Sequence, residues 1–323
     1  MQTLLSVVIT SFNESVYLDK IFTDISRQDF DCNSFEILFL EAGSDSHTRA
    51  LKALGNLSKI LKYWHVPGLS RTASLNFLIK EASGSLIVRL DARTHINPDY
   101  LSKIYTLARR EKVANVGGVQ IPIGDSKSQK LIALIMSHPF GLGGGKFRDK
   151  IYKGDVDSLY LGAFSRRYMP EQPWFDERLP KISEDSDLNF RLRKAGGRVI
   201  LDSSVIAWHY PRESLKTFFR LCFNYGVGRG LFLMKHRQFS APRQLVLPVA
   251  FLIALSLSGL GVIYPFLYSL LFIGIFSYLA LILLISFRAR DRSFRDAFFL
   301  TSGFVGCHFF WTIGLFYALI IYR

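Results

Sequence analysis

Short apolar runs alternate with amphipathic stretches along the first 120 residues of the 323-residue chain. The apolar runs, which are typical of buried strands, cover residues 4–10, 35–43, 62–66, 85–92 and 113–122. The stretches between them carry apolar residues at helical spacing, as Leu18, Ile21 and Ile25 do, and cover residues 16–28, 47–61, 70–83 and 97–111. This βαβα order predicts an α/β fold with a mostly parallel sheet and helices on both faces.

Polar side chains gather where three of the predicted strands end, at residues 10–14, 41–45 and 91–95. Asn, Asp, Ser and Gly are common in turns, so one such cluster alone would indicate only a turn. In a parallel sheet, however, the carboxyl ends of the strands meet at one edge, where ligands bind. The three clusters together therefore predict a binding site at that edge.

A second set of elements follows residue 180. Residues 183–197 predict a helix with acidic residues in its first turn and basic residues towards its end, which suits the helix dipole. Residues 198–202 predict a strand. Residues 213–236 form a basic, amphipathic stretch, which we expect to lie along a membrane surface.

The C-terminal part of the chain is apolar over unusual lengths. Residues 245–287 and 297–322 contain no Asp, Glu, Lys or Arg. A bilayer-spanning helix needs roughly 20 apolar residues, so these runs predict three transmembrane helices, near 245–263, 265–287 and 297–321. A pair of helices buried in a soluble core is the alternative, but runs of this length are unusual there.

The formal net charge of +14 raises the possibility of nucleic-acid binding. Much of this charge, however, flanks the apolar runs, at Lys235, Arg237, Arg243, Arg288, Arg290, Arg292 and Arg295. Flanking cations mark the cytoplasmic side of a membrane and attract anionic headgroups. We therefore expect a multi-pass protein of the inner (plasma) membrane that binds no nucleic acid.

The division into domains follows from these patterns. We expect a cytoplasmic catalytic domain at residues 1–210, amphipathic interfacial helices at 211–240 and a membrane domain at 241–323. The N-terminal sequence MQTLLSVVIT has no basic segment and is predicted to be a strand, not a signal peptide. Cys32, Cys222 and Cys307 are widely spaced, which indicates neither a disulfide framework nor a zinc site.

The chemistry of the strand ends centres on Asp91, which closes the strand 85–92. A carboxylate there can hold Mg²⁺ or Mn²⁺, which bind few protein carboxylates and bridge to phosphates. Such a metal neutralises a diphosphate leaving group. Glu184 and Asp185 supply a second acidic site, and either carboxylate could deprotonate an acceptor hydroxyl. A metal-bound diphosphate and a base together describe sugar transfer from a nucleotide-sugar.

Four segments resemble those of glycosyltransferase family 2, whose members have a GT-A fold and invert the configuration of the anomeric carbon. They are VVITSFNES, EILFLEAGSDSHT, LDAR and ISEDSDLNFRLRKAGGRVIL, in the order and spacing of the family. The resemblance covers about residues 4–236. The segments PFGLGGGKFR and YGVGRG, with the three predicted spans, look more like the membrane-attached exopolysaccharide branch, of the succinoglycan glucosyltransferase type.

The resemblance implies a role for each matching residue. It places Thr10, Phe12, Asn13, Glu14 and Asp45 in the nucleotide pocket, with Glu14 and Asp45 on the base or ribose. It makes Asp91 the metal ligand of the D-x-D motif, with His209 as a further ligand. It makes Asp185 the catalytic base and Glu184 its support. Arg71, Arg93, Arg212 and Arg229 complete the set of residues expected to bind the nucleotide-sugar.

Two positions depart from the family pattern. Arg93 stands at the third D-x-D position, so His209 or His95 would complete the metal site, or Arg93 would itself offset phosphate charge. Glu41 and Ala42 replace the usual pair of aspartates. We expect transfer from a UDP-hexose to a hydroxyl of a polyprenyl-diphosphate-linked saccharide. The alternatives are a polyprenyl-phosphate glycosyltransferase, a processive polysaccharide synthase and a non-catalytic scaffold that binds nucleotide-sugars.

Overall fold

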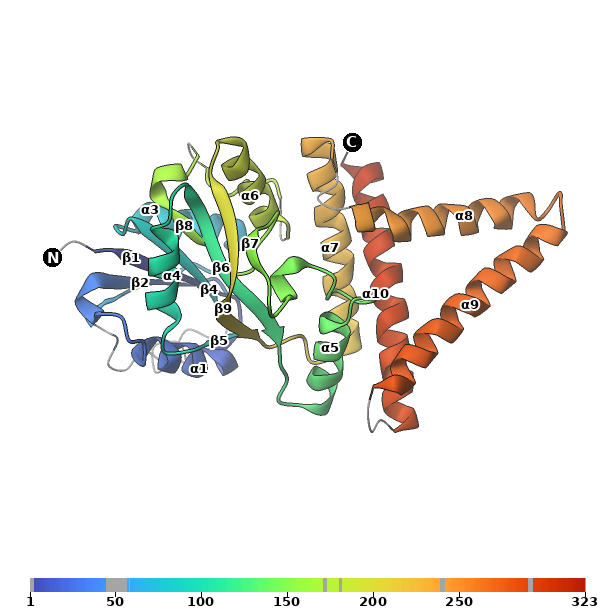
Figure 1. Ribbon diagram of the computed structural model, residues 1–323, viewed down its shortest axis with the longest axis horizontal. Coiled ribbons are helices and arrows are strands. Elements are labelled where there is room, and N and C mark those ends of the chain that lie inside the picture. Colours follow the sequence, from blue (N-terminus) through green and yellow to red (C-terminus); the bar gives the residue numbers. More distant parts are fainter. Residues whose placement is uncertain are drawn as a thin grey trace. The chain divides into compact units, whose positions relative to one another are not determined.

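The chain folds into two compact units in the computed structural model (Figure 1). The structure describes residues 3–44, 57, 59–170, 173–179, 182–238, 242–289 and 293–322. The first unit contains Met1–Ile123 and Gly145–Tyr210, and the second contains Gly124–Gly144 and Pro211–Arg323. Residues 124–144, which the sequence-based division places in the catalytic domain, therefore pack within the second unit.

A nine-stranded sheet forms the centre of the first unit in the described part of the chain. Its parallel strands are β1 (Leu5–Ser11), β2 (Phe35–Glu41), β3 (Leu61–His65), β4 (Leu86–Asp91), β6 (Val113–Pro122) and β9 (Arg198–His209). Antiparallel to them run β5 (Thr94–Ile96), β7 (Lys153–Asp155) and β8 (Ala163–Ser165). The strand order is β3-β2-β1-β4-β8-β6-β9-β5, with β7 paired to β9.

Helices cover both faces of this sheet, as the βαβα order predicts. They are α1 (Ser15–Ser26), α3 (Arg71–Glu81), α4 (Tyr100–Ala108) and α6 (Glu184–Lys194), with 3-10 turns at Cys32–Ser34, Lys146–Arg148 and Arg166–Tyr168. Successive side chains of a strand point to opposite faces. Val7 accordingly packs in the cluster with α1 and α4, whereas Val8 packs in the cluster with α3 and α6. Burying each such apolar side chain stabilises the fold by roughly 1.5–3 kcal/mol.

The register of the sheet brings the three polar strand ends together. Thr10 at the end of β1 lies opposite Asp91 at the end of β4. On the other side of β1, Ser11 lies opposite Glu41 at the end of β2. The prediction that these three strand ends share one edge is therefore confirmed. The helix predicted at residues 47–61 lies mostly outside the described residues.

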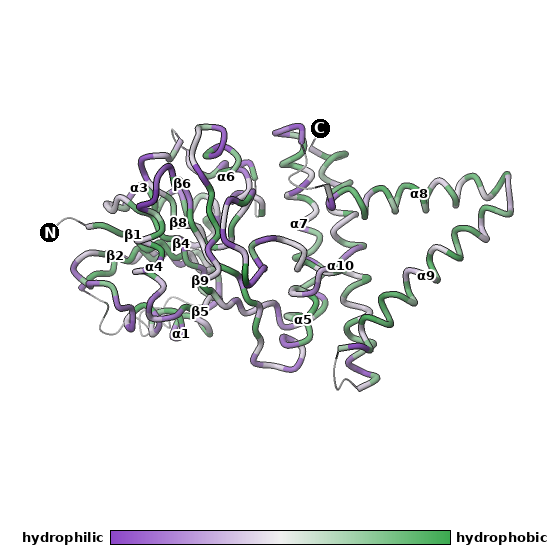
Figure 2. Tube along the Cα trace, viewed as in Figure 1, coloured by the Kyte–Doolittle hydropathy of each residue, from purple (hydrophilic) through white to green (hydrophobic). Residues whose placement is uncertain are grey.

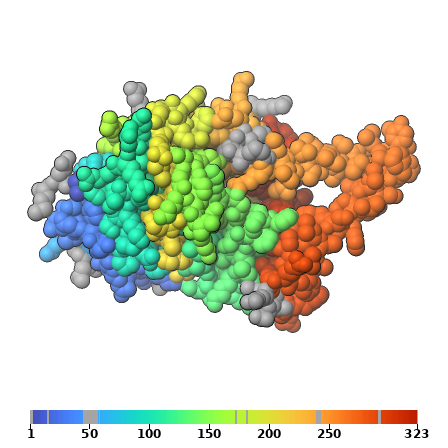
Figure 3. Space-filling view, viewed as in Figure 1, coloured from blue at the N-terminus to red at the C-terminus, as the bar shows by residue number. Residues whose placement is uncertain are grey.

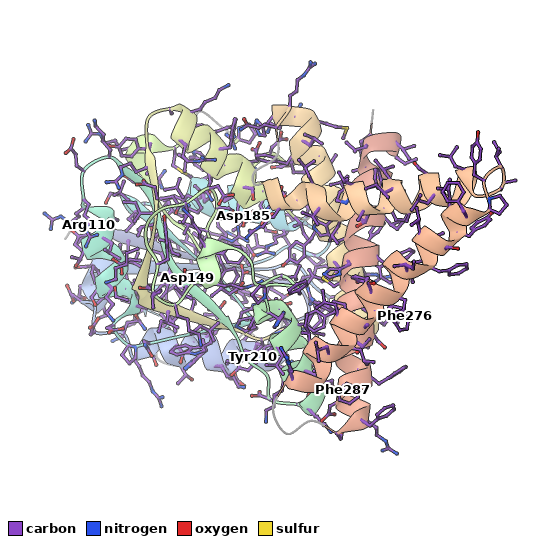
Figure 4. The ribbon with its side chains drawn as sticks, turned by 45° about the vertical axis from the view of Figure 1, so that its right-hand side comes forward. Arg110, Asp149, Asp185, Tyr210, Phe276 and Phe287 are labelled. Carbon is purple, nitrogen blue, oxygen red and sulfur yellow. The ribbon has the colours of Figure 1, made fainter. Side chains whose placement is uncertain are left out.

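The second unit is helical. It consists of α5 (Lys127–Ser137), α7 (Leu215–His236), a 3-10 turn (Pro242–Leu245), α8 (Val246–Leu260), α9 (Phe266–Arg288) and α10 (Phe294–Ile321). In the described part of the chain, three segments are long and apolar enough to cross a membrane: Arg243–Leu260, Phe266–Arg288 and Phe294–Ile321. Figure 2 shows α8 and α9 as mostly hydrophobic along their whole length. Phe276 and Phe287 are exposed on α9 (Figure 4), as expected for side chains that face lipid.

Close contacts through glycine hold α7 against α10. A methyl group added at Gly226 of α7 would collide with the carbonyl oxygen of Trp311, and one at Gly314 of α10 would collide with that of Phe223. Glycine at these positions lets the two backbones approach closely. The apolar face of the predicted amphipathic helix is thus packed on α10. Cys222 and Cys307 are both buried in this second unit as free thiols.

Candidate active site

Arg93 and Glu14 join the end of β4 to the start of α1. Arg93 Nε donates to Glu14 Oε1 at 2.8 Å, and its guanidinium lies 4.5 Å from the centre of the Tyr17 ring. The residue at the third D-x-D position therefore pairs with the carboxylate expected to contact the nucleotide. Of the other residues assigned to this pocket, Thr10 is buried, whereas Phe12 is 60% exposed.

Glu41 at the end of β2 is a buried carboxylate that sequence reasoning registered only as a departure. Its Oε1 accepts hydrogen bonds from the backbone N–H groups of Gly43, at 2.6 Å, and Asn13, at 3.2 Å. Asn13 has a positive φ of 55°, which presents its N–H to this carboxylate. Glu41 Oε2 is buried and lacks a hydrogen-bond partner among the described atoms. Buried acceptors in this state are unusual and call for a partner.

Asp91 is held by two arginines. Arg71 Nη2 donates to both carboxylate oxygens of Asp91 at 2.7 Å, and Arg89 Nε lies 3.5 Å from Asp91 Oδ1. Burial by itself raises the pKa of Asp91, but the positive charges of Arg71 and Arg89 outweigh it and lower that pKa to about 2. Asp91 is therefore an anion at neutral pH.

Arg89 connects Asp91 with the first turn of α6. Its Nη2 donates to Glu184 Oε1 at 3.0 Å, and the Arg89 and Glu184 side chains are 6% and 4% exposed. Arg71 Nε lies 3.9 Å from the same oxygen. Sequence reasoning missed Arg89, although a cation within the apolar run of β4 is a signal, because a buried charge must be paired.

Asp185 differs from its neighbour Glu184. It is half-buried in the first turn of α6 (Figure 4), and its Oδ1 accepts a hydrogen bond from the backbone N–H of Ser186 at 2.7 Å. The α6 N-terminus, which follows Ser183 in the left-handed conformation, favours a negative charge at this position. The two adjacent carboxylates thus have different environments.

His209 at the end of β9 belongs to a short hydrogen-bonded chain. Its Nδ1 bonds the Tyr160 hydroxyl at 3.0 Å, and Tyr160 bonds Thr94 Oγ1 at 3.2 Å. Across the pairing of β5 with β9, His209 lies opposite Thr94, which follows Asp91 by three positions in the chain. Burial and the charge of Asp91 raise the pKa of Tyr160 well above its usual range, so Tyr160 is a neutral hydroxyl. His95 instead bonds Asp24 at 2.7 Å through its Nδ1.

The residues present fit a divalent cation by type. In the described part of the chain, no three His, Cys, Asp or Glu side chains form a metal-binding group. Mg²⁺ and Mn²⁺ on a nucleotide, however, need only one or two protein ligands, because phosphate and water oxygens complete the shell. Asp91 and His209 meet that requirement.

Three of the predicted site residues lie outside the described part of the first unit. Asp45 lies outside the described residues. Arg212 precedes α7 and Arg229 lies on α7, both in the second unit. Their roles stay predictions that rest on the resemblance.

A cavity of about 540 Å³ in the first unit is separate from this site. It is lined by Arg109, Arg110, Lys112, Arg167 and neighbouring residues, where β6 and β9 begin. Figure 3 shows the surfaces of these two chain regions, teal and yellow, side by side. Because parallel sheets bind ligands at the opposite, carboxyl ends of their strands, this cavity is not part of the candidate active site.

Comparison with known proteins agrees with this arrangement. The model of Glycosyl transferase family 2 matches residues 6–169, just over half of the chain. Among curated proteins, the chain is 25% identical over 252 residues to succinoglycan biosynthesis protein ExoA of Rhizobium meliloti (strain 1021). The aligned residues make up 76% of each of the two chains. It is 24% identical over 240 residues to a protein of Methanococcus voltae, covering 72% of this chain and 74% of the relative. That relative is named dolichyl N-acetyl-α-D-glucosaminyl phosphate 3-β-D-2,3-diacetamido-2,3-dideoxy-β-D-glucuronosyltransferase.

The fold is also shared with a solved structure. The mannosyltransferase PcManGT from Pyrobaculum calidifontis, in complex with GDP-Man and Mn²⁺, aligns over 100% of this chain and 89% of its own, with a TM-score of 0.62 and 14% identity. The prediction of a GT-A fold followed by apolar C-terminal helices is therefore confirmed. The family match spans the strands that position Glu14, Glu41 and Asp91, and the chain belongs to glycosyl transferase family 2 and is a glycosyltransferase.

Proposed function

We propose that the enzyme transfers a sugar from a UDP-hexose to a hydroxyl group of a lipid-linked saccharide, with inversion at the anomeric carbon. The observation that carries this proposal is the contrast between the two acidic residues that open α6. Glu184 is buried and paired with Arg89, whereas Asp185 is half-buried. Glu184 therefore serves to position the site, and Asp185 is the carboxylate able to reach an acceptor.

The reaction needs one base and one displacement. Asp185 accepts the proton of the acceptor hydroxyl while the acceptor oxygen attacks the anomeric carbon from the face opposite the leaving diphosphate. An α-linked donor then gives a β-linked product, with no covalent enzyme intermediate, unlike retaining two-carboxylate glycosidases. An acceptor that is already an anion, such as a polyprenyl monophosphate, would need no base, so Asp185 favours a hydroxyl acceptor.

Glu41 bears on the choice of base. Its Oε2 is completely buried, so a base would reach it only if the chain around Asn13 moved on binding; a ring N–H group, such as that of uracil, would then donate to it. Guanine also offers a ring N–H, and the solved neighbour holds GDP-Man, so the experiments below include both nucleotides.

Mg²⁺ or Mn²⁺ would be held by Asp91 and His209 and would neutralise the charge that develops on the leaving diphosphate. The Mn²⁺ in the PcManGT complex supports this use of a cation. Arg93 is paired with Glu14, so we assign it to positioning the nucleotide pocket.

A lipid-linked acceptor is supported by the names of the two relatives. One acts on a dolichyl-linked sugar phosphate, and the other belongs to succinoglycan biosynthesis. We propose the synthesis of exopolysaccharide, capsule or another cell-surface glycan. The apolar helices α8, α9 and α10 would anchor the enzyme in the inner (plasma) membrane, with the catalytic residues on the cytoplasmic side.

Replacing Asp185 tests the proposal directly. We expect Asp185→Asn to lower turnover by about 10²–10⁴-fold, because it removes the base, while UDP still raises the melting temperature of the protein. The assay uses detergent-purified enzyme with UDP-hexoses and a lipid-linked saccharide, and it records released UDP. Wild-type turnover in Asp185→Asn would refute the base assignment. Stabilisation by GDP alone would exclude a UDP donor, and stabilisation by a nucleotide without turnover of any donor would favour the scaffold alternative.

A further inference from the structure

Four charged side chains at the carboxyl edge of the sheet form a closed set of ion pairs, which we call the charge ring: Arg71, Arg89, Asp91 and Glu184. Arg71 and Arg89 each lie within 4 Å of both carboxylates. Two guanidinium groups and two carboxylates balance, so the charge ring is neutral. It sits at the edge where Asp91 is proposed to hold a cation.

Arg71 occupies the position that a cation on Asp91 would take. Its Nη2 is 2.7 Å from Oδ1 and 2.7 Å from Oδ2, so one positively charged group bridges both carboxylate oxygens. A divalent cation placed beside this guanidinium would be strongly repelled, because two like charges about 4 Å apart interact by several kcal/mol in a partly buried site. The cation and Arg71 therefore cannot share these oxygens.

The two arginines of the charge ring differ in their freedom to move. The Arg71 side chain is 39% exposed and lies in the first turn of α3, next to the N-cap Ser70. The Arg89 side chain is 6% exposed within β4, and its Nε has no hydrogen-bond acceptor in the described part of the chain. Arg71 can leave Asp91 without disturbing the core, whereas Arg89 stays with Glu184.

We propose that Arg71 and the divalent cation compete for Asp91. Without donor, Arg71 holds Asp91. When a nucleotide-sugar binds together with a cation, Arg71 would turn to the donor's diphosphate and leave the Asp91 carboxylate able to hold the cation. A cation alone would leave the neutral charge ring with two excess positive charges, whereas the diphosphate cancels them. This proposal rests on the cation use described above, and it makes Arg71 a positioning residue that couples cation binding to donor binding.

Binding of Mn²⁺ alone to the full-length protein in detergent tests the competition, with free Mn²⁺ followed by electron paramagnetic resonance. We expect Arg71→Gln to bind Mn²⁺ without nucleotide about tenfold more tightly than wild type, which is within the usual range of coupling between sites. The control is Arg198→Gln, which removes the same charge from an ion pair with Asp155 at the start of β9, away from the candidate active site. Its Mn²⁺ affinity should stay within about twofold of wild type.

A second variant distinguishes the proposed competition from a folding defect caused by the loss of Arg71. Arg71→Lys keeps the positive charge but loses the bidentate fork, and its Mn²⁺ affinity should fall between those of wild type and Arg71→Gln. Adding UDP should tighten Mn²⁺ binding to wild type more than to Arg71→Gln. Unchanged Mn²⁺ affinity in Arg71→Gln, or equal tightening in Arg198→Gln, would overturn the competition.

The outcomes also separate this inference from the proposed function. If UDP stabilises the wild-type protein equally with Mn²⁺ and with EDTA, the cation use itself is wrong and the competition falls with it, while sugar transfer stands. If UDP binding needs Mn²⁺ and Arg71→Gln leaves Mn²⁺ affinity unchanged, only the competition fails.

Discussion

Glu36 at the start of β2 ties three chain segments together through one buried carboxylate. Its Oε1 accepts hydrogen bonds from Ser6 Oγ at 2.7 Å and from the Ser83 backbone N–H at 2.6 Å, while Lys62 Nζ lies 2.9 Å from Oε2. Burial raises the pKa of Glu36, but the bonds from Ser83 and Ser6 outweigh it and lower the pKa from 4.5 to about 2. The charged form is therefore the one that the fold stabilises.

A pH-dependent stability follows from Glu36. Because its pKa is lower in the folded state, its contribution is complete above pH 4.5 and is lost as the pH falls from there to about 2. We expect Glu36→Gln to destabilise the protein at pH 7 by about 3 kcal/mol, with the difference from wild type shrinking below pH 4.5. Melting temperatures across this pH range measure it. Glu111→Gln, at an 88% exposed side chain, is the control and should change little; a pH-independent Glu36 effect would contradict the assignment.

At the scale of elements, the pairing of α7 with α10 depends on particular glycines. Gly226 faces the Trp311 backbone, whereas Gly274 on α9 has no atom within 4 Å of an added Cβ. We expect Gly226→Ala to destabilise the second unit by about 1–3 kcal/mol, because the added methyl group forces the helices apart. Thermal unfolding in detergent measures this loss. Gly274→Ala is the matched control, with no loss expected; equal melting temperatures for the two variants would mean that α7 and α10 are not in close contact.

At the scale of the whole molecule, the positions of charged residues suggest the orientation in the membrane. The turn between α8 and α9 is uncharged, whereas cations flank the other ends of both helices. We expect a cysteine at Val262, which is 76% exposed, to react with a membrane-impermeant maleimide added to intact cells. Cys32, which is exposed in the catalytic unit, should react only after permeabilisation. Labelling of Cys32 in intact cells would reverse the proposed orientation.

Several features were determined by the sequence alone. The apolar runs and the helical spacing predicted most described elements of the parallel sheet and its helices. The N-cap of α3 is Ser70, whose Oγ accepts from the Ala73 N–H. The uncharged C-terminal runs predicted three candidate spans that agree with the structure. These features are local, since periodicity, capping and hydrophobic length are properties of contiguous residues.

Other features required the tertiary structure. Short β5 and β8 were missed because three-residue strands carry no periodic signal and exist only through pairing with β9, β4 and β6. The helix α5 was also missed, although Ser126 and Gln129 form a capping box at its start. The pattern of apolar and polar residues predicted no element at α5. Its apolar side chains pack with other residues of the second unit.

The candidate active site was likewise determined partly by the sequence and partly by the tertiary structure. Motif spacing selected Asp91, Glu184 and Asp185, but a motif does not say which side chains are paired. Arg71 and Arg89 are 18 positions apart in the chain, and only folding brings both of them to the carboxylates of Asp91 and Glu184. Folding also pairs Arg93 with Glu14 and not with Asp91. Pair interactions depend on distance in space and on burial, and neither is encoded by position along a single sequence.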